Sequence, residues 1–334
     1  MADTPLERLR RLAVPGGAVG LSWLGQAGFI LRAGDATALV DPFLAPYDGR
    51  VYESGLAATQ AEGIDVVLCT HEHVDHLDAD SAPAIAAASP GAVFVVPTPI
   101  VDMVTEAGIA PDRVVGLQPG ETVELAGLTV RAVPAMHGVT MEDAYGFGES
   151  LSGGLVRFLG YVVDAGDVRL YHAGDTIHYE GMETTLRDLE IDVAMLPING
   201  RDPERERRGI VGNLSEREAA WLARTIGADV VVPMHYDLFA RNRGYPAHLV
   251  ESIERDHPGT TALVPARDEP FIWSSGRKRL ERSCTWVRAA WSTRRRRIRR
   301  RARAKWCSPR ARRRSAARTS TASARRARGG SPRS

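Results

Sequence analysis

The segment from His71 to His76 carries four side chains of the kinds that bind divalent metals. His71, His73, Asp75 and His76 fall within six residues, directly after an apolar run at residues 65–69. Imidazole nitrogens and carboxylate oxygens suit zinc, iron and manganese, and a strand-to-helix loop can bring all four to one small volume. A cation held there lowers the pKa of water to about 7 and makes hydroxide available near neutral pH. The spacing therefore predicts a hydrolytic metal centre rather than a polar turn that happens to be rich in histidine.

Such a centre needs further ligands from distant segments. His137, Asp175 and His235 each come a few residues after a predicted strand. Loops at strand ends carry functional side chains on a rigid scaffold. We therefore expect these three residues to join the His71–His76 segment at one edge of the fold.

The pattern of residues 1–276 predicts strands and helices in two similar halves, at about residues 18–135 and 155–265. The first three predicted strands, joined by tight Gly or Asp turns, form an antiparallel meander at residues 19–23, 28–32 and 37–40. The predicted helices span residues 78–88, 99–107 and 214–226, the last opening with a capping box at Ser215 and Glu218. Two facing sheets with helices outside satisfy this pattern.

Charge divides the chain of 334 residues into an acidic body and a basic tail. Residues 277–334 contain 21 Arg and 2 Lys against one acidic residue, whereas residues 1–276 contain 20 basic and 40 acidic residues. No apolar run reaches the about 18 residues of a membrane span, so we expect no membrane association. The body has one cysteine, Cys69, which excludes a disulfide framework and predicts a cytoplasmic location.

The tail at residues 277–334 has no apolar periodicity, and its arginine runs repel one another, so we expect it to be disordered. Two origins remain open. A native tail would make nucleic acid a partner, which the acidic body alone would repel. A non-native reading frame is the favoured alternative, because residues 1–276 contain no Lys and shifted frames of GC-rich genes yield Arg, Ala and Ser.

Together the motifs resemble the metallo-β-lactamase superfamily, and within it the L-ascorbate-6-phosphate lactonase-like branch. The resemblance spans roughly residues 18–274. Besides the His71–His76 segment it is carried by Trp23-Leu24-Gly25, the stretches 171–176 and 231–237, and Pro270-Phe271-Ile272-Trp273. It implies an αββα sandwich over residues 1–276, with a metal site at the edge of the two sheets.

The resemblance also implies a ligand arrangement around one or two zinc or manganese ions. One cation is bound by His71, His73 and His137, a second by Asp75, His76 and His235, and Asp175 bridges the two. Asp75 has a catalytic role as well, because a positioned carboxylate can accept a hydrogen bond from the attacking water. Asp41, at a strand end, is expected to orient a ligand histidine.

The predicted activity is hydrolysis of a small anionic lactone or ester by a metal-bound hydroxide. His178, Asn199 and Arg201 are candidates for contacting this substrate, Arg201 by clamping a phosphate or carboxylate. Two alternatives remain open: a phosphodiesterase or nuclease of the same superfamily, which would depend on the basic tail, and a non-catalytic metal-binding protein. The sequence also leaves open whether the chain forms a homo-oligomer.

Overall fold

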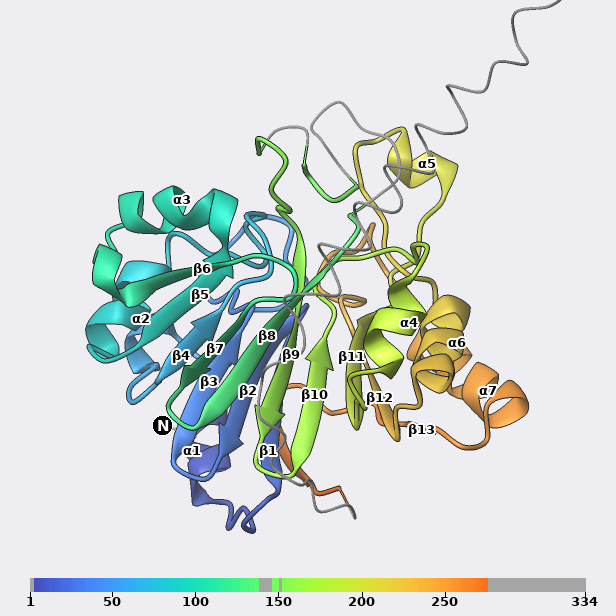
Figure 1. The fold of residues 1–334 in the computed structure, drawn as a ribbon, viewed down its shortest axis with the longest axis horizontal. Helices are drawn as coiled ribbons and strands as arrows, with labels where there is room; N and C mark the ends of the chain where they lie inside the picture. Colours follow the sequence, from blue (N-terminus) through green and yellow to red (C-terminus); the bar gives the residue numbers. More distant parts are fainter. Residues whose placement is uncertain (1–2, 138–145, 150–151, 276–334) are drawn as a thin grey trace, which may run out of the picture. The chain divides into compact units, whose positions relative to one another are not determined.

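The computed structural model describes residues 3–137, 146–149 and 152–275. Within these ranges two seven-stranded sheets face each other, and helices cover their outer faces (Figure 1). This arrangement confirms the αββα sandwich. The tail at residues 277–334, whose disorder was predicted, lies outside the described residues.

The first sheet has the strand order β14-β1-β2-β3-β4-β5-β6. Its strands are β1 (Val19–Gly25), β2 (Gly28–Ala33), β3 (Ala36–Val40), β4 (Val66–Leu68), β5 (Val93–Pro97), β6 (Val114–Leu117) and β14 (Pro270–Trp273). Strands β1, β2 and β3 pair antiparallel, which confirms the predicted meander. Strands β3 to β6 are parallel, so the carboxyl ends of β3 and β4 lie at the same edge.

The second sheet has the order β13-β12-β11-β10-β9-β8-β7. Its strands are β7 (Thr122–Leu125), β8 (Leu128–Pro134), β9 (Leu159–Ala165), β10 (Val168–His172), β11 (Val193–Pro197), β12 (Val230–Met234) and β13 (Thr261–Ala262). Strands β10 to β13 are parallel. The boundary between the sheets does not coincide with the predicted halves at 18–135 and 155–265, because β7 and β8 belong to the second sheet and β14 pairs with β1. An apolar pattern reveals a strand but not its partner.

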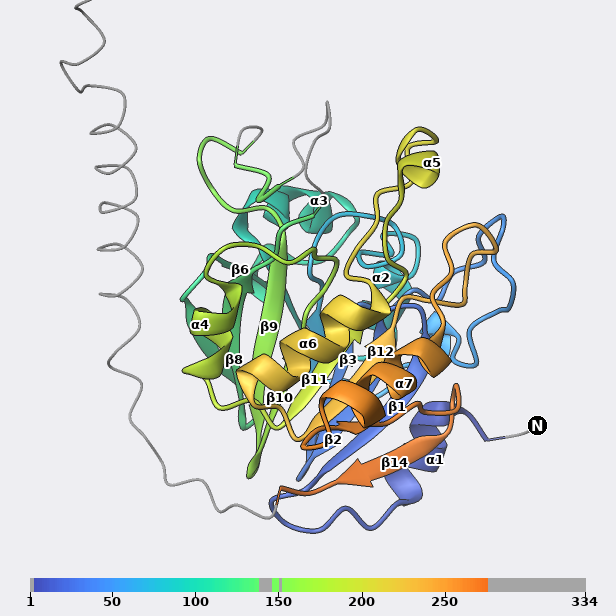
Figure 2. The same ribbon diagram turned by 90° about the vertical axis from the view of Figure 1, so that its right-hand side faces the viewer.

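Helices α1 (Pro5–Arg11), α2 (Ala82–Ala88) and α3 (Val101–Glu106) bury apolar side chains against the first sheet. Helices α4 (Met182–Arg187), α6 (Glu216–Ile226) and α7 (Pro246–Asp256) cover the second, with α6 and α7 side by side (Figure 2). Short turns form η1 (Ala58–Gln60), η2 (Thr98–Ile100), η3 (Pro111–Arg113) and the one-turn helix α5 (Pro203–Glu206). In the described ranges no helix is both long and apolar enough to cross a bilayer.

The three predicted helices form with shifted starts. Helix α6 has the predicted capping box, with Ser215 as its N-cap and Glu218 as the reciprocal partner. Helix α2 begins later than predicted because Asp78 acts in the preceding loop, where its carboxylate accepts hydrogen bonds from the backbone N–H groups of Leu44, Ala45 and Ser81. The helix predicted at 99–107 divides into η2 and α3.

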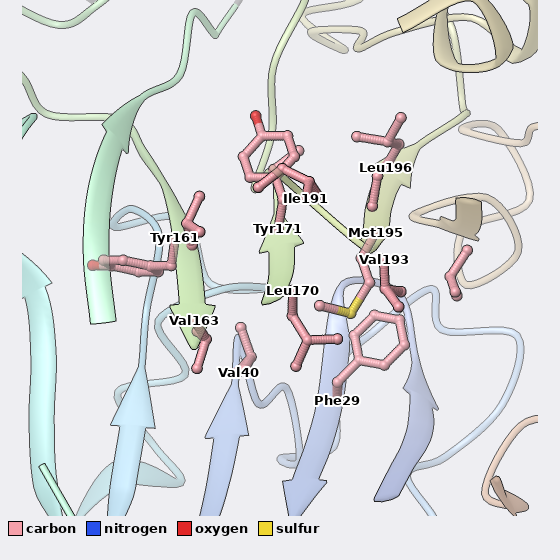
Figure 3. Close-up of a cluster of buried hydrophobic side chains, with 14 of the residues drawn as sticks. Phe29, Val40, Tyr161, Val163, Leu170, Tyr171, Ile191, Val193, Met195 and Leu196 are labelled. Atoms are coloured by element: carbon pink, nitrogen blue, oxygen red, sulfur yellow. The ribbon is translucent and has the colours of Figure 1, made fainter. Parts of the chain in front are cut away.

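The core lies between the two sheets. Phe29 and Val40 from the first sheet lie among Val163, Leu170 and Met195 from the second (Figure 3). Burying an apolar side chain of this size contributes about 1.5–3 kcal/mol. Because such interiors are close-packed, they fix the strand ends from which the chemically active side chains emerge.

Candidate metal centre

The loop between β4 and α2 holds the first four ligand candidates. The backbone N–H groups of His76 and Leu77 both donate to the carbonyl oxygen of His73, at 2.9 and 2.8 Å. This tight turn folds the loop back on itself. It directs His71, His73, Asp75 and His76 toward one volume, where the structure also brings His137, Asp175 and His235.

Three imidazoles form the first group. The Nε2 atoms of His71 and His137 lie 3.0 and 3.1 Å from Nδ1 of His73. Zinc–nitrogen bonds of about 2.0–2.1 Å put neighbouring ligand atoms about 3 Å apart, so these separations suit one shared cation. The Phe158 ring stands edge-on to His71 and His137, with centroid distances of 5.6 and 5.2 Å, and gives this group an apolar wall.

Two imidazoles and a carboxylate form the second group. Oδ2 of Asp75 lies 3.2 Å from Nε2 of His235 and 3.7 Å from Nε2 of His76. His235 follows β12 and has a φ of 58°, in the left-handed region that a β-carbon disfavours. Its backbone N–H donates to the carbonyl oxygen of Gln26, 2.8 Å away, which ties the two sheets together at the site.

Asp175 lies between the two groups. Its Oδ2 is 3.5 Å from Nε2 of His137, while its Oδ1 is 3.3 Å from Nε2 of His76 and 3.2 Å from Nε2 of His235. Gly174, just before it, has a φ of 60°, and a β-carbon there would lie 2.8 Å from the carbonyl oxygen of Leu159. Glycine therefore lets the chain turn closely enough for each carboxylate oxygen to face one group.

Burial keeps two histidines of the first group, His71 and His137, neutral. It lowers the pKa of His71 well below its ordinary value, and the nearby imidazoles of His76 and His73 add to the effect. Burial likewise lowers the pKa of His137 to about 3, although Asp175 opposes the shift. Neutral imidazole is the form that binds a metal, so these ligands are ready at neutral pH.

The second group combines opposite charges. Burial alone would raise the pKa of both Asp75 and Asp175, but His76 and His235 outweigh it and hold both values below the ordinary range. In return, the carboxylates overcome the effect of burial and raise the pKa of His76 and His235. A cation entering this group meets two ionised carboxylates and must displace protons from the imidazoles.

Two buried atoms mark where a cation fits. Nε2 of His76 and Oδ1 of Asp175 are buried and lie 3.3 Å apart as an ion pair, without the geometry of a hydrogen bond. An unsatisfied buried polar group costs about 1–3 kcal/mol. A divalent cation held by both atoms would satisfy them, and their nitrogen and oxygen donors accept zinc, manganese or iron.

Asp41, which follows β3, orients His76 as expected. Its Oδ2 lies 2.6 Å from Nδ1 of His76, and its two oxygens accept hydrogen bonds from the hydroxyl and the backbone N–H of Thr70, each at 2.8 Å. Asp41 is completely buried. Holding Nδ1 in this way leaves Nε2 of His76 directed at the second group.

The three substrate candidates have structural partners. Asn199 is buried and forms side-chain hydrogen bonds with Asn242 and Asn213. Both terminal nitrogens of Arg201 bind the carboxylate of Glu218, at 2.8 and 2.7 Å. His178 lies 3.0 Å from a carboxylate oxygen of Glu183, and its ring stands edge-on to Trp221 on α6.

Sequence reasoning missed two residues at the centre. Gln26 contacts both Asp75 and His235 through its side-chain nitrogen, and its place after the motif Trp23-Leu24-Gly25 was an available signal. Phe158 packs against the histidines of the first group. Nothing in the pattern around Phe158 distinguishes it from other core aromatics.

Comparison with known proteins agrees with this geometry. Residues 37–236 match the family model of the β-lactamase superfamily domain. This chain belongs to the metallo-β-lactamase superfamily. A relative described as a metal-dependent hydrolase of the UPF0173 group, from Methanoculleus marisnigri, is 33% identical over 245 residues, which are 73% of this chain and 92% of the relative. A second, from Myxococcus xanthus, is 29% identical over 75% of this chain and 81% of its own length.

Several solved structures share the fold. Igni18, a metallo hydrolase from Ignicoccus hospitalis, matches with a TM-score of 0.60 and 22% identity over 77% of this chain and 99% of its own. An isothiocyanate hydrolase from Delia radicum gut bacteria matches with a TM-score of 0.61 and 17% identity over 77% of this chain and 100% of its own. From its sequence relatives and its grouped His and Asp side chains, this chain is a metal-dependent hydrolase.

Proposed function

We propose that this metallo-β-lactamase superfamily member hydrolyses a small lactone or ester that carries an anionic group, as the resemblance to the L-ascorbate-6-phosphate lactonase-like branch implies. The observation that carries the proposal is the position of Asp175, whose two oxygens face two separate ligand groups. Such an arrangement could hold two cations, and zinc or manganese are the expected metals.

The residues of the chain have distinct tasks in this reaction. Bound divalent cations would polarise the scissile carbonyl and lower the pKa of the attacking water. Asp75 remains ionised and is the most exposed of the carboxylates at the centre, with 17% of its side chain accessible. It is therefore placed to accept a hydrogen bond from that water and to orient it. Phe158 shields one side of the imidazoles from solvent.

Charge supports an anionic substrate. Two divalent cations would bring four positive charges, against three carboxylates from Asp41, Asp75 and Asp175, while His71 and His137 are neutral. Before a hydroxide binds, the loaded centre would therefore have a net charge of about +1, which would favour the approach of an anion. We also propose a cytoplasmic location, because Cys69 is buried and free.

Metal analysis of the full-length protein, followed by a substrate panel, tests the proposal. The panel contains sugar lactones with and without a phosphate, a simple ester, a phosphodiester and, because one fold neighbour hydrolyses it, an isothiocyanate. We expect two cations per chain and fastest turnover of the phosphorylated lactone, and no turnover by the His73→Ala variant. Turnover of the phosphodiester alone would favour the phosphodiesterase alternative. Bound metal without turnover of any ester or lactone would favour a non-catalytic role.

A further inference from the structure

Gln26 reaches the second ligand group from the turn between β1 and β2. Its side chain is buried, with 2% of the residue exposed. The side-chain nitrogen lies 2.8 Å from Oδ2 of Asp75 and 2.9 Å from Nε2 of His235. A glutamine amide in contact with two ligand atoms at once is part of the centre and not only of the turn.

The backbone holds this side chain firmly in place. Gln26 has a φ of 50°, a conformation that costs a non-glycine residue of order 1–3 kcal/mol. Its carbonyl oxygen accepts hydrogen bonds from the indole of Trp23 and from the backbone N–H of His235, and its own N–H donates to the hydroxyl of Tyr52. Three segments of the chain, at Trp23, Tyr52 and His235, thus fix a strained residue beside the ligand candidates.

The distances around the second group place the amide tip at the corner of a coordination shell. Ligand atoms bound to one cation at about 2.0–2.2 Å, at right angles to one another, lie about 3 Å apart. Asp75 and His235 contact the amide tip at 2.8 and 2.9 Å, and they lie 3.2 Å from each other. Oδ1 of Asp175 follows at 3.2 Å from His235. The amide tip therefore has the spacing of a further ligand.

Whether the amide nitrogen or the amide oxygen of Gln26 lies at that corner depends on whether the neighbouring atoms accept hydrogen bonds. The nitrogen and the oxygen of a glutamine amide have nearly the same shape and are told apart by their hydrogen-bond partners, so the nitrogen is placed beside atoms that accept hydrogen bonds. A cation bound by Asp75 and His235 uses the lone pair of His235, so an N–H can no longer donate to it. Rotating the amide by half a turn then puts the carbonyl oxygen, a ligand of hard cations, at the same corner.

We propose that the Gln26 carboxamide is a ligand of the second cation, supplying its Oε1. This inference rests on the proposal that both groups bind cations. It gives the second position two nitrogens and three oxygens, from His76, His235, Asp75, Asp175 and Gln26. The first position remains dominated by three imidazoles, so the two positions differ in donor chemistry, and the oxygen-rich one suits manganese.

Manganese binding to the full-length apoprotein tests the proposal without relying on activity. Free Mn²⁺ is measured by electron paramagnetic resonance during titration of the wild type, Gln26→Leu, Gln26→Glu and the control Gln60→Leu. Gln60 is exposed, and its side chain bonds only a neighbouring backbone N–H, so it controls for loss of a glutamine. Circular dichroism melting confirms that each variant is folded, and Gln26→Met replaces Gln26→Leu if the latter is not.

We expect Gln26→Leu to lower the affinity for the second Mn²⁺ by roughly 10–100-fold and to change the affinity for the first by no more than about twofold. Gln26→Glu keeps or strengthens the second ion, because either carboxylate oxygen can occupy the corner, and Gln60→Leu matches the wild type. If the affinity for the second ion is unchanged or increased in Gln26→Leu, or is decreased in Gln26→Glu, the proposal for Gln26 is overturned. Such a result leaves the two-cation proposal standing. A wild type that binds a single Mn²⁺ overturns the two-cation proposal as well.

Discussion

Replacing Asp41 by Asn removes one charge from the buried contact that orients His76. Asn has nearly the same size, and it tolerates the positive φ of 43° at this position better than most residues. The substitution leaves the backbone strain in place. It changes the partner of Nδ1 of His76. In the wild type this atom lies 2.6 Å from a carboxylate oxygen of Asp41.

The expected effect follows from the imidazole tautomer. The carboxylate of Asp41 accepts a hydrogen bond from Nδ1 of His76, which leaves the lone pair of Nε2 for the cation. The Asn side chain can instead donate to Nδ1, and that favours a proton on Nε2, where the cation should bind. Loss of such a hydrogen-bond partner of a ligand typically lowers the affinity for the metal by 10–100-fold, which corresponds to about 1.4–2.7 kcal/mol of binding free energy.

Asp78→Asn is the matched control. Asp78 is also buried, but its carboxylate accepts hydrogen bonds from backbone N–H groups of Leu44, Ala45 and Ser81, and among the described residues it has no hydrogen bond or ion pair with an imidazole. Mn²⁺ titration of both variants, with thermal melting by circular dichroism, separates the two roles. We expect both variants to be less stable than the wild type, and only Asp41→Asn to lower the affinity for the second ion. Equal second-ion affinity in the two variants would refute the orienting role of Asp41.

Three further predictions test the centre and its surroundings. His73→Ala should lose one cation, and Asp175→Ala should weaken the binding of both cations. Elemental analysis measures the bound metal, and circular dichroism checks that each variant remains folded. Two tightly bound cations in either variant would contradict the assignment. Arg201→Ala should lower the unfolding free energy by roughly 1 kcal/mol and leave KM unchanged for anionic and neutral substrates, whereas a rise in KM for the anionic one alone would restore Arg201 as a clamp. Burial raises the pKa of Glu218, but Arg201 and Ser215 together outweigh it and hold this pKa below its ordinary value. Glu218→Gln should therefore lower the unfolding free energy at neutral pH, and the difference from the wild type should shrink as the pH falls from about 5 to about 3. Urea unfolding across that range measures it, and a loss that grows toward acid pH contradicts the shift.

The sequence predicted the parts of the fold that depend on local patterns. The meander of β1 to β3 and the capping box of α6 follow from tight turns and from Ser215 and Glu218, which act within a few residues. The pairing of β8 with β9 was not predictable, because alternating apolar residues specify a buried face and not the neighbouring strand. The late start of α2 depends on contacts from Asp78 to Leu44 and Ala45, more than thirty residues away.

The candidate site was predictable to the extent that residue type reveals chemistry. Histidines and aspartates at strand ends pointed to the seven residues that the structure brings together. Arg201 shows the limit of this reasoning, because a guanidinium that resembles an anion clamp in sequence is bound by Glu218 in the fold. Gln26 shows the opposite limit, since an amide reveals its role only through the atoms it touches.

Backbone strain adds a signal that the sequence does not contain. Gln26, Asp41 and His235 all have positive φ angles, at 50°, 43° and 58°, and all three contact the centre. Each such conformation costs of order 1–3 kcal/mol and persists only where the surrounding structure enforces it. Here the enforcement comes from the ends of closely packed strands, with Gln26 and His235 hydrogen-bonded to each other across the two sheets. The simplest physical reason to keep three strained residues together is that relaxed backbones would aim their side chains away from the ligand groups.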